Sequence, residues 1–294
     1  MTAEPDSRSP KHLRLALALS LFALSGLLLA GCTWTGKGKE VADAFEKTAA
    51  IKTATYSGSM KMQIVGAPGT AAGDDTFDMT FTGAADSTNP AAPKASMTME
   101  MMGERIEVAE PGDGNIYMAS RAGAYGAPIN PVDRAKSEKT FARILAALEP
   151  AIGNFRDGSP MTTNEGTMLK PIVADGNRGK ICSGVVPAFG DYMSAAGSGE
   201  SGFDSLGGGL DIESFCKSFL TADPTLWFGI DDGGLLRMIA VEAKLAVPGA
   251  EIKLSLRFDV GAVDQPVSIE KPRGVRMLAS QAELERQVGA AAAK

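Results

Sequence analysis

Three stretches near the start of the chain decide the fold: residues 56–64 (YSGSMKMQI), 76–84 (TFDMTFTGA) and 96–102 (SMTMEMM). In each stretch apolar and polar residues alternate with a period of two, which is typical of β-strands with one buried face. The connections between them are short and rich in turn-forming residues, so neighbouring strands should run antiparallel. The three stretches predict an antiparallel meander.

The rest of the chain extends this pattern. Further alternation predicts strands at 105–109, 115–120, 225–231, 235–247, 251–260 and 267–269, and helical spacing predicts helices at 40–50, 133–148 and 278–290. Strands, then helices, then strands again are typical of an α+β domain and not of a βαβ array.

The alternation places methionine on one face of the first three predicted strands. The apolar positions of this face, called the methionine face below, are Met60, Met62, Ile64, Phe77, Met79, Phe81, Met97, Met99 and Met101. Core strands usually favour β-branched residues, whereas flexible methionine recurs on surfaces that accept ligands of varied shape. Three interpretations stay open: a solid core, the wall of an apolar cavity for acyl chains, and Cu(I) binding by thioethers, for which no supporting His or Cys is present.

The N-terminal segment has the features of a targeting signal. A short basic region precedes an apolar run at 15–29, which is too short to span a bilayer comfortably. Residues 29–32 (LAGC) have the order of a bacterial lipobox, in which cleavage occurs just before a lipid-bearing cysteine. We therefore expect 1–31 to be a signal peptide and Cys32 to be the lipidated first residue, followed by a tether within 32–39. An ordinary secretory signal is the alternative.

Composition excludes several classes of function. The chain has a net charge of −6, and because the signal segment holds three basic and two acidic residues, the mature chain carries −7. An acidic chain without a basic run argues against nucleic acid as a partner. The only histidine, His12, lies in the signal segment, so the mature chain cannot use Ser-His-Asp or Cys-His catalysis or a His-ligated metal. Nothing predicts a catalytic residue, a cofactor or a metal site.

The two cysteines of the mature domain, Cys182 and Cys216, predict a disulfide, because an isolated pair outside the cytoplasm is usually bridged. In the chain-entropy treatment such a bridge stabilises the fold by ~4 kcal/mol. A redox or metal role is the weaker interpretation, because the pair is not a Cys-x-x-Cys motif. The bridge would enclose a Gly- and Ser-rich loop at 197–209.

Three short stretches resemble the LppX/LprG-type lipoproteins of actinobacteria, which are related in shape to the LolA/LolB carriers: 50–56 (AIKTATY), 226–237 (LWFGIDDGGLLR) and 265–272 (QPVSIEKP). The resemblance implies a strongly curved antiparallel sheet, a half barrel, with helices packed on its concave side and an apolar cavity between them. It covers a single domain at 40–272, which leaves 273–294 as a C-terminal helical extension. The cysteine pair, the Gly-rich loop and the C-terminal extension depart from the family pattern.

Members of that family bind and move acylated lipids or lipoglycans, which would make the methionine face part of a cavity wall. The expectation is a non-enzymatic lipoprotein, anchored by Cys32 on the outer face of the cytoplasmic membrane, that binds or carries acylated lipids. The alternative is an interaction or sensor lipoprotein with a solid core and functional surface loops. A hydrolase that works without histidine ranks third.

Overall fold

The computed structural model describes residues 34–66, 75–130, 134, 143–144, 146–188, 191, 212–247 and 250–292. Cys32, the signal segment, the Gly- and Ser-rich loop 197–209 and most of the predicted helix 133–148 lie outside the described residues. The strands are β1 Thr53–Val65, β2 Asp75–Asp86, β3 Lys94–Met101, β4 Glu104–Glu110, β5 Asn115–Ser120, β6 Gly123–Pro128, β7 Ile152–Asp157, β8 Met161–Thr162, β9 Met168–Gly176, β10 Thr225–Ile230, β11 Leu236–Val247, β12 Ala250–Val263 and β13 Arg276–Met277.

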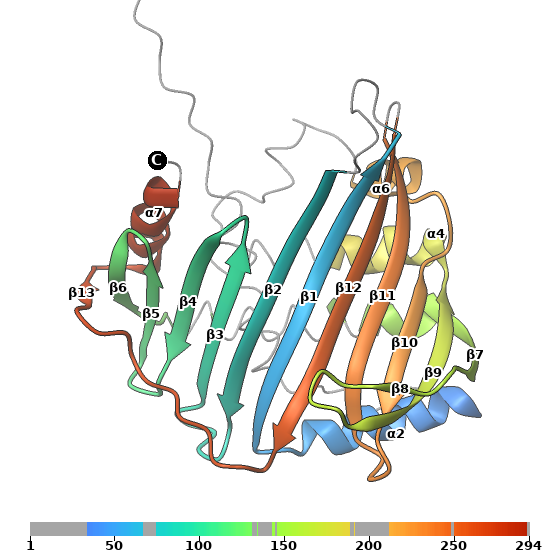
Figure 1. Ribbon diagram of the computed structural model, residues 1–294, viewed down its shortest axis with the longest axis horizontal. Coiled ribbons are helices and arrows are strands. Elements are labelled where there is room, and N and C mark those ends of the chain that lie inside the picture. The colour runs from blue at the N-terminus through green and yellow to red at the C-terminus, as the bar shows by residue number, and fades with distance from the viewer. Residues whose placement is uncertain are drawn as a thin grey trace, which may run out of the picture.

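These strands form one large, curved and open sheet in the order β13-β6-β5-β4-β3-β2-β1-β12-β11-β10-β9-β7, with β8 paired to β9 (Figure 1). All pairings are antiparallel except that between β13 and β6. Strands β1 to β6 follow one another as a meander, and so do β9 to β12, and the two halves meet where β1 pairs with β12. The fold is therefore the α+β class that the sequence pattern predicts, with the half-barrel shape that the family resemblance implies.

The helices lie on the concave face of the sheet (Figure 1). They are α2 Lys37–Ala49, α4 Arg178–Lys180, the π-helical turn η1 Ile181–Val185, α6 Ile212–Phe219 and α7 Gln281–Ala292. Helix α2 buries Val41, Ala44 and Phe45 against β9, β10 and β11, because these apolar residues recur at helical spacing. Helix α7 packs at the other end of the sheet, against β5 and β6.

The apolar side chains gather in two clusters on this concave face. The first cluster lies under β2 to β6 and contains most of the methionine face together with residues of α7. The second cluster lies between α2 and strands β9 to β11, where Phe45 contacts Phe228 with ring centroids 5.9 Å apart. The core is thus divided between the two ends of the sheet.

Two details differ from the sequence predictions. Helix α2 begins at Lys37, within the segment expected to be a tether. The predicted strand at 267–269 is wrong, because this segment has no strand pairing. Strand β12 already has β1 and β11 as neighbours, so the chain after it finds no free edge there. It crosses below the strands and pairs only at the free edge of β6, as the short parallel strand β13 (Figure 1).

Candidate functional site

The strand register brings all nine residues of the methionine face together on the concave side of the sheet. Met60, Met79 and Met101 lie directly opposite one another across β1, β2 and β3. In the next row Met99 lies between Phe81 and Ile106. Residues opposite one another in antiparallel strands point to the same face, so the rows form one continuous apolar surface.

Two glycines allow aromatic rings to lie flat on this surface. A side chain at Gly58 would collide with the ring of Phe81, and one at Gly83 would collide with the ring of Tyr56. The Tyr56 ring in turn stacks on Phe258 of β12 with ring centroids 5.8 Å apart. Because the rings occupy the space above the glycines, this part of the methionine face is filled by packed side chains.

Five residues of the methionine face are buried and the other four are half-buried. Met79, Phe81, Met97, Met99 and Met101 are buried within the first cluster. Met60 and Phe77 pack against the edge of this cluster, and Met62 and Ile64 are half-buried. The buried half therefore serves as core, whereas the other half keeps part of its surface accessible.

Part of what buries the first cluster comes from the C-terminal segment. Leu284 and Val288 of α7 are each only 1 % exposed and pack in the cluster with Met118 of β5, and Leu278 joins them just before the helix. The spacing of four residues between Leu284 and Val288 is the signal in the sequence that this helix has one apolar face. Sequence reasoning placed the helix but not its contact with the methionine face.

The half-buried residues continue across the middle of the sheet, between the two clusters. Met62 lies opposite Leu254, and Ile64 lies opposite Ile252. We call the half-buried apolar residues on the concave side of β2, β1, β12 and β11 the central strip: Met60, Met62, Ile64, Phe77, Val241, Ala243, Leu245, Ile252, Leu254 and Leu256. Four adjacent strands place about 14 Å between the outer ones, so the strip is a broad apolar surface.

One buried carboxylate lies next to the apolar first cluster. Glu110, at the end of β4, is 4 % exposed and forms an ion pair with Arg134. Burial raises the pKa of the Glu110 carboxyl, because desolvation disfavours its charged form, and the Arg134 charge opposes this shift. Burial also raises the pKa of nearby Tyr56, whose hydroxyl donates a hydrogen bond of 2.6 Å to the Ser96 carbonyl.

A second buried charge lies next to the second cluster. Arg237 of β11 is 8 % exposed, and its Nε lies 3.5 Å from a carboxylate oxygen of Asp231. The Nε and Nη1 atoms are buried and have no hydrogen-bond acceptor within the described residues. Donors in this state cost free energy, since they have lost water and gained only a long ion pair.

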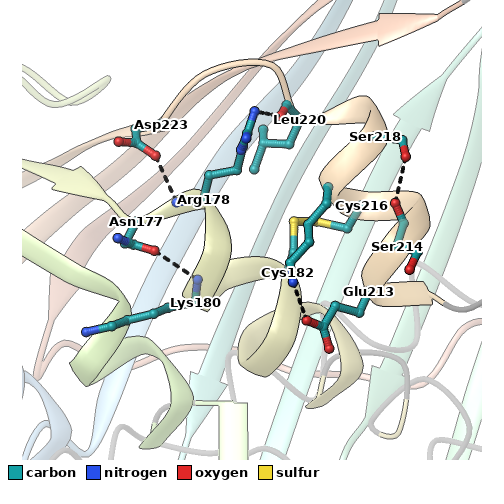
Figure 2. Close-up of a disulfide and its surroundings, with 11 residues drawn as sticks. Asn177, Arg178, Lys180, Cys182, Glu213, Ser214, Cys216, Ser218, Leu220 and Asp223 are labelled. Carbon is teal, nitrogen blue, oxygen red and sulfur yellow. Dashed lines mark hydrogen bonds and ion pairs between the residues drawn. A yellow bond between two sulfur atoms is a disulfide. The ribbon is translucent and has the colours of Figure 1, made fainter.

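The predicted disulfide between Cys182 and Cys216 is confirmed, and it joins η1 to α6 (Figure 2). Hydrogen bonds reinforce the same connection: Arg178 donates from Nη1 to the Leu220 carbonyl at 3.1 Å and from its backbone N–H to Asp223 at 2.9 Å. The bridge thus anchors both ends of the segment that contains the Gly- and Ser-rich loop, on the side of the sheet that carries the central strip.

Two further observations bear on the predicted sites. Within the described part of the chain no helix is long and apolar enough to cross a membrane. A hollow of about 300 Å³ is lined by polar side chains that alternate with the central strip, and also by Ala243 and Leu254 of the strip itself: Ala222, Asp223, Thr225, Glu242, Ala243, Lys244, Lys253, Leu254 and Ser255. None of the nine residues of the methionine face lines this hollow.

Comparison with known proteins gives only distant likenesses. No protein-family model matches the sequence, and no curated protein is significantly similar to it. One similar solved structure is a β-barrel-like protein of the DUF1849 domain of unknown function from Brucella abortus, with 8% identity and a TM-score of 0.22 over 72% of this chain and 100% of that one. Another is a DUF1329 family protein from Desulfovibrio piger, with 9% identity and a TM-score of 0.22 over 79% of this chain and 94% of that one.

Proposed function

We propose that this protein is a lipoprotein, anchored through Cys32 on the outer face of the cytoplasmic membrane, that binds or carries acylated lipids on the central strip. The observation that carries the proposal is the division of the concave face. Both ends of the sheet are closed by packed helices, whereas the apolar residues between them are only half-buried. Partly accessible apolar surface of this kind is typical of a binding site.

The chemistry of the strip suits an acyl chain. Each buried methylene contributes about 0.8 kcal/mol, so a chain with about ten methylenes half enclosed gains ~4 kcal/mol before ordering costs. Methionine on one side of the strip adapts to chains of different length and unsaturation, because its side chain is unbranched and flexible. The proposed activity needs no catalytic group. The order LAGC before the mature chain and the resemblance to lipid-carrying lipoproteins support the same proposal.

The first experiment uses the unlipidated domain, expressed from Thr33 onward and purified without detergent. Organic extraction and mass spectrometry should find co-purifying acylated lipid. After lipid removal, fatty acid or phospholipid should raise the melting temperature, because a ligand that binds only the folded state stabilises it. Absence of both effects would contradict the carrier proposal and favour an interaction or sensor lipoprotein with a solid core.

A matched pair of variants locates the site. Met62→Lys places a charge in the central strip, where it should abolish lipid uptake while the fold survives, because the half-buried position lets the lysine amine reach water. Thr80→Lys is the control, since Thr80 is exposed on the convex face of β2 beside Met79. Equal lipid uptake by the two variants would show that the strip is not the site.

A further inference from the structure

The chain just after Cys32 is held against the folded domain. The Trp34 ring lies 5.0 Å from the ring of Phe155 in β7, and its Nε1 donates a hydrogen bond of 3.1 Å to the Glu149 carbonyl. Gly38, in the first turn of α2, leaves the necessary room: a side chain there would lie 2.8 Å from the Trp34 Cβ and 2.9 Å from the Phe155 ring. Trp34 is nevertheless only half-buried. Its position is fixed while part of the residue stays accessible.

This arrangement leaves almost no free tether. Only Thr33 separates Trp34 from Cys32, and two residues of extended chain span at most ~7 Å. The headgroup layer on each side of a bilayer is itself about 5–8 Å thick. If lipid chains on Cys32 are embedded in the bilayer, the Trp34 side chain must therefore lie at the level of the headgroups. Tryptophan favours this level, because its ring is apolar and its N–H is polar.

We propose that the end of the domain formed by Trp34, the first turn of α2 and the edge strand β7 is a docking surface for the lipid bilayer. This inference rests on the proposed lipidation of Cys32. The molecule would stand on the β7 edge of its sheet, and the opposite edge, formed by β6, β13 and α7, would point away from the membrane (Figure 1). The concave face with the central strip would then open sideways, close above the bilayer surface.

The charges around Trp34 indicate which forces hold this surface to the bilayer. Lys37 lies 2.9 Å from Asp157, Lys39 lies 2.7 Å from Asp43, and a third basic residue, Arg156, lies 2.8 Å from Asp175. Each of these cations already has a carboxylate partner, so among the described residues of this surface they form no free basic cluster for anionic lipids. Docking should therefore depend on the short chain and the Trp34 ring, and only weakly on salt or lipid charge.

The test uses the full-length lipidated protein in phosphatidylcholine vesicles. The chain has two tryptophans, so Trp227→Phe leaves Trp34 as the only indole and Trp34→Phe leaves Trp227. Trp227 is the matched control, because it lies on β10, two strands in from the β7 edge and about 10 Å from it. Phospholipids brominated near the headgroup should quench Trp34 strongly and Trp227 little. The difference should persist when anionic lipid or salt is added.

A lengthened tether tests the role of the short chain. Ten Gly and Ser residues inserted between Thr33 and Trp34 would span ~17 Å, so the quenching of Trp34 should fall while the protein stays on the vesicles. Equal quenching of the two tryptophans in the native-length protein would overturn the docking surface. Protein that does not sediment with vesicles would overturn both lipidation and docking. Strong quenching of Trp34 without any extractable lipid would support docking and count against the carrier function alone.

Discussion

Truncating methionine at two depths tests whether the methionine face is one solid core. Met99 is 1 % exposed and lies between Phe81 and Ile106, both buried, so Met99→Ala removes three heavy atoms from a packed interior. Such a change costs ~3 kcal/mol, the lost burial plus the cavity left behind. Met62 is half-buried between Phe77 and Leu254. Its neighbours can close over the gap, so Met62→Ala should cost about 1 kcal/mol.

Thermal unfolding of the delipidated domain separates these values. For a chain of this size 1 kcal/mol shifts the melting temperature by about 2–4 °C. Met99→Ala should therefore lower the melting temperature by about 6–12 °C and Met62→Ala by about 2–4 °C. Lipid should stabilise Met99→Ala as it does the native protein, but Met62→Ala less. Equal losses for the two variants in delipidated protein would refute the reasoning, because the strip would then be as tightly packed as the core.

Four other substitutions have defined outcomes. Because burial raises the pKa of the Glu110 carboxyl, its contribution is fully present below the unfolded pKa and is lost as pH rises through the folded pKa. The stability of Glu110→Gln relative to the native protein should thus rise as the pH in urea titrations rises above the unfolded pKa of about 4, and a constant difference would exclude this linkage. Asp231→Ala should cost about 3 kcal/mol because it leaves buried Arg237 uncompensated, whereas Arg237→Met should be neutral or stabilising in the same assay. Cys216→Ser should lower the free energy of unfolding by ~4 kcal/mol, measured against the native protein under non-reducing conditions.

The sequence predicts those strands and helices in which buried residues recur at regular spacing along the chain. Strand β3 is the clearest instance, since Ala95, Met97, Met99 and Met101 are buried in alternation. Strand β9 was not predicted, because its central residues are buried in succession and Pro171 interrupts the apolar run. Strand β6 was missed as well, since its small residues show no period. The pairing of β13 with β6 follows from which edge is free, and the sequence alone does not reveal this.

The sequence predicts which residues make up the candidate site, but it does not predict how deeply each of them is buried. Alternation placed Met62 and Met99 on the same face, and it assigned them the same environment. Their difference arises from distant partners, since Leu284 and Val288 of α7 pack in the cluster that contains Met99. Trp34 was likewise assigned to a tether, because nothing near it in sequence predicts its contacts with Phe155 and the Glu149 carbonyl. Contacts between residues more than a hundred positions apart have no local pattern.

The pairing of β1 with β12 has a consequence for the order in which the chain folds. The two strands align over eleven residue pairs, such as Met60 with Leu256, although about two hundred residues separate them in sequence. The meander from β1 to β6 can form early, but its first strand keeps a free edge until the last third of the chain arrives. Closing so long a loop is slow, and an exposed strand edge invites pairing with other chains. The newly made protein should therefore aggregate most readily before β12 completes the sheet.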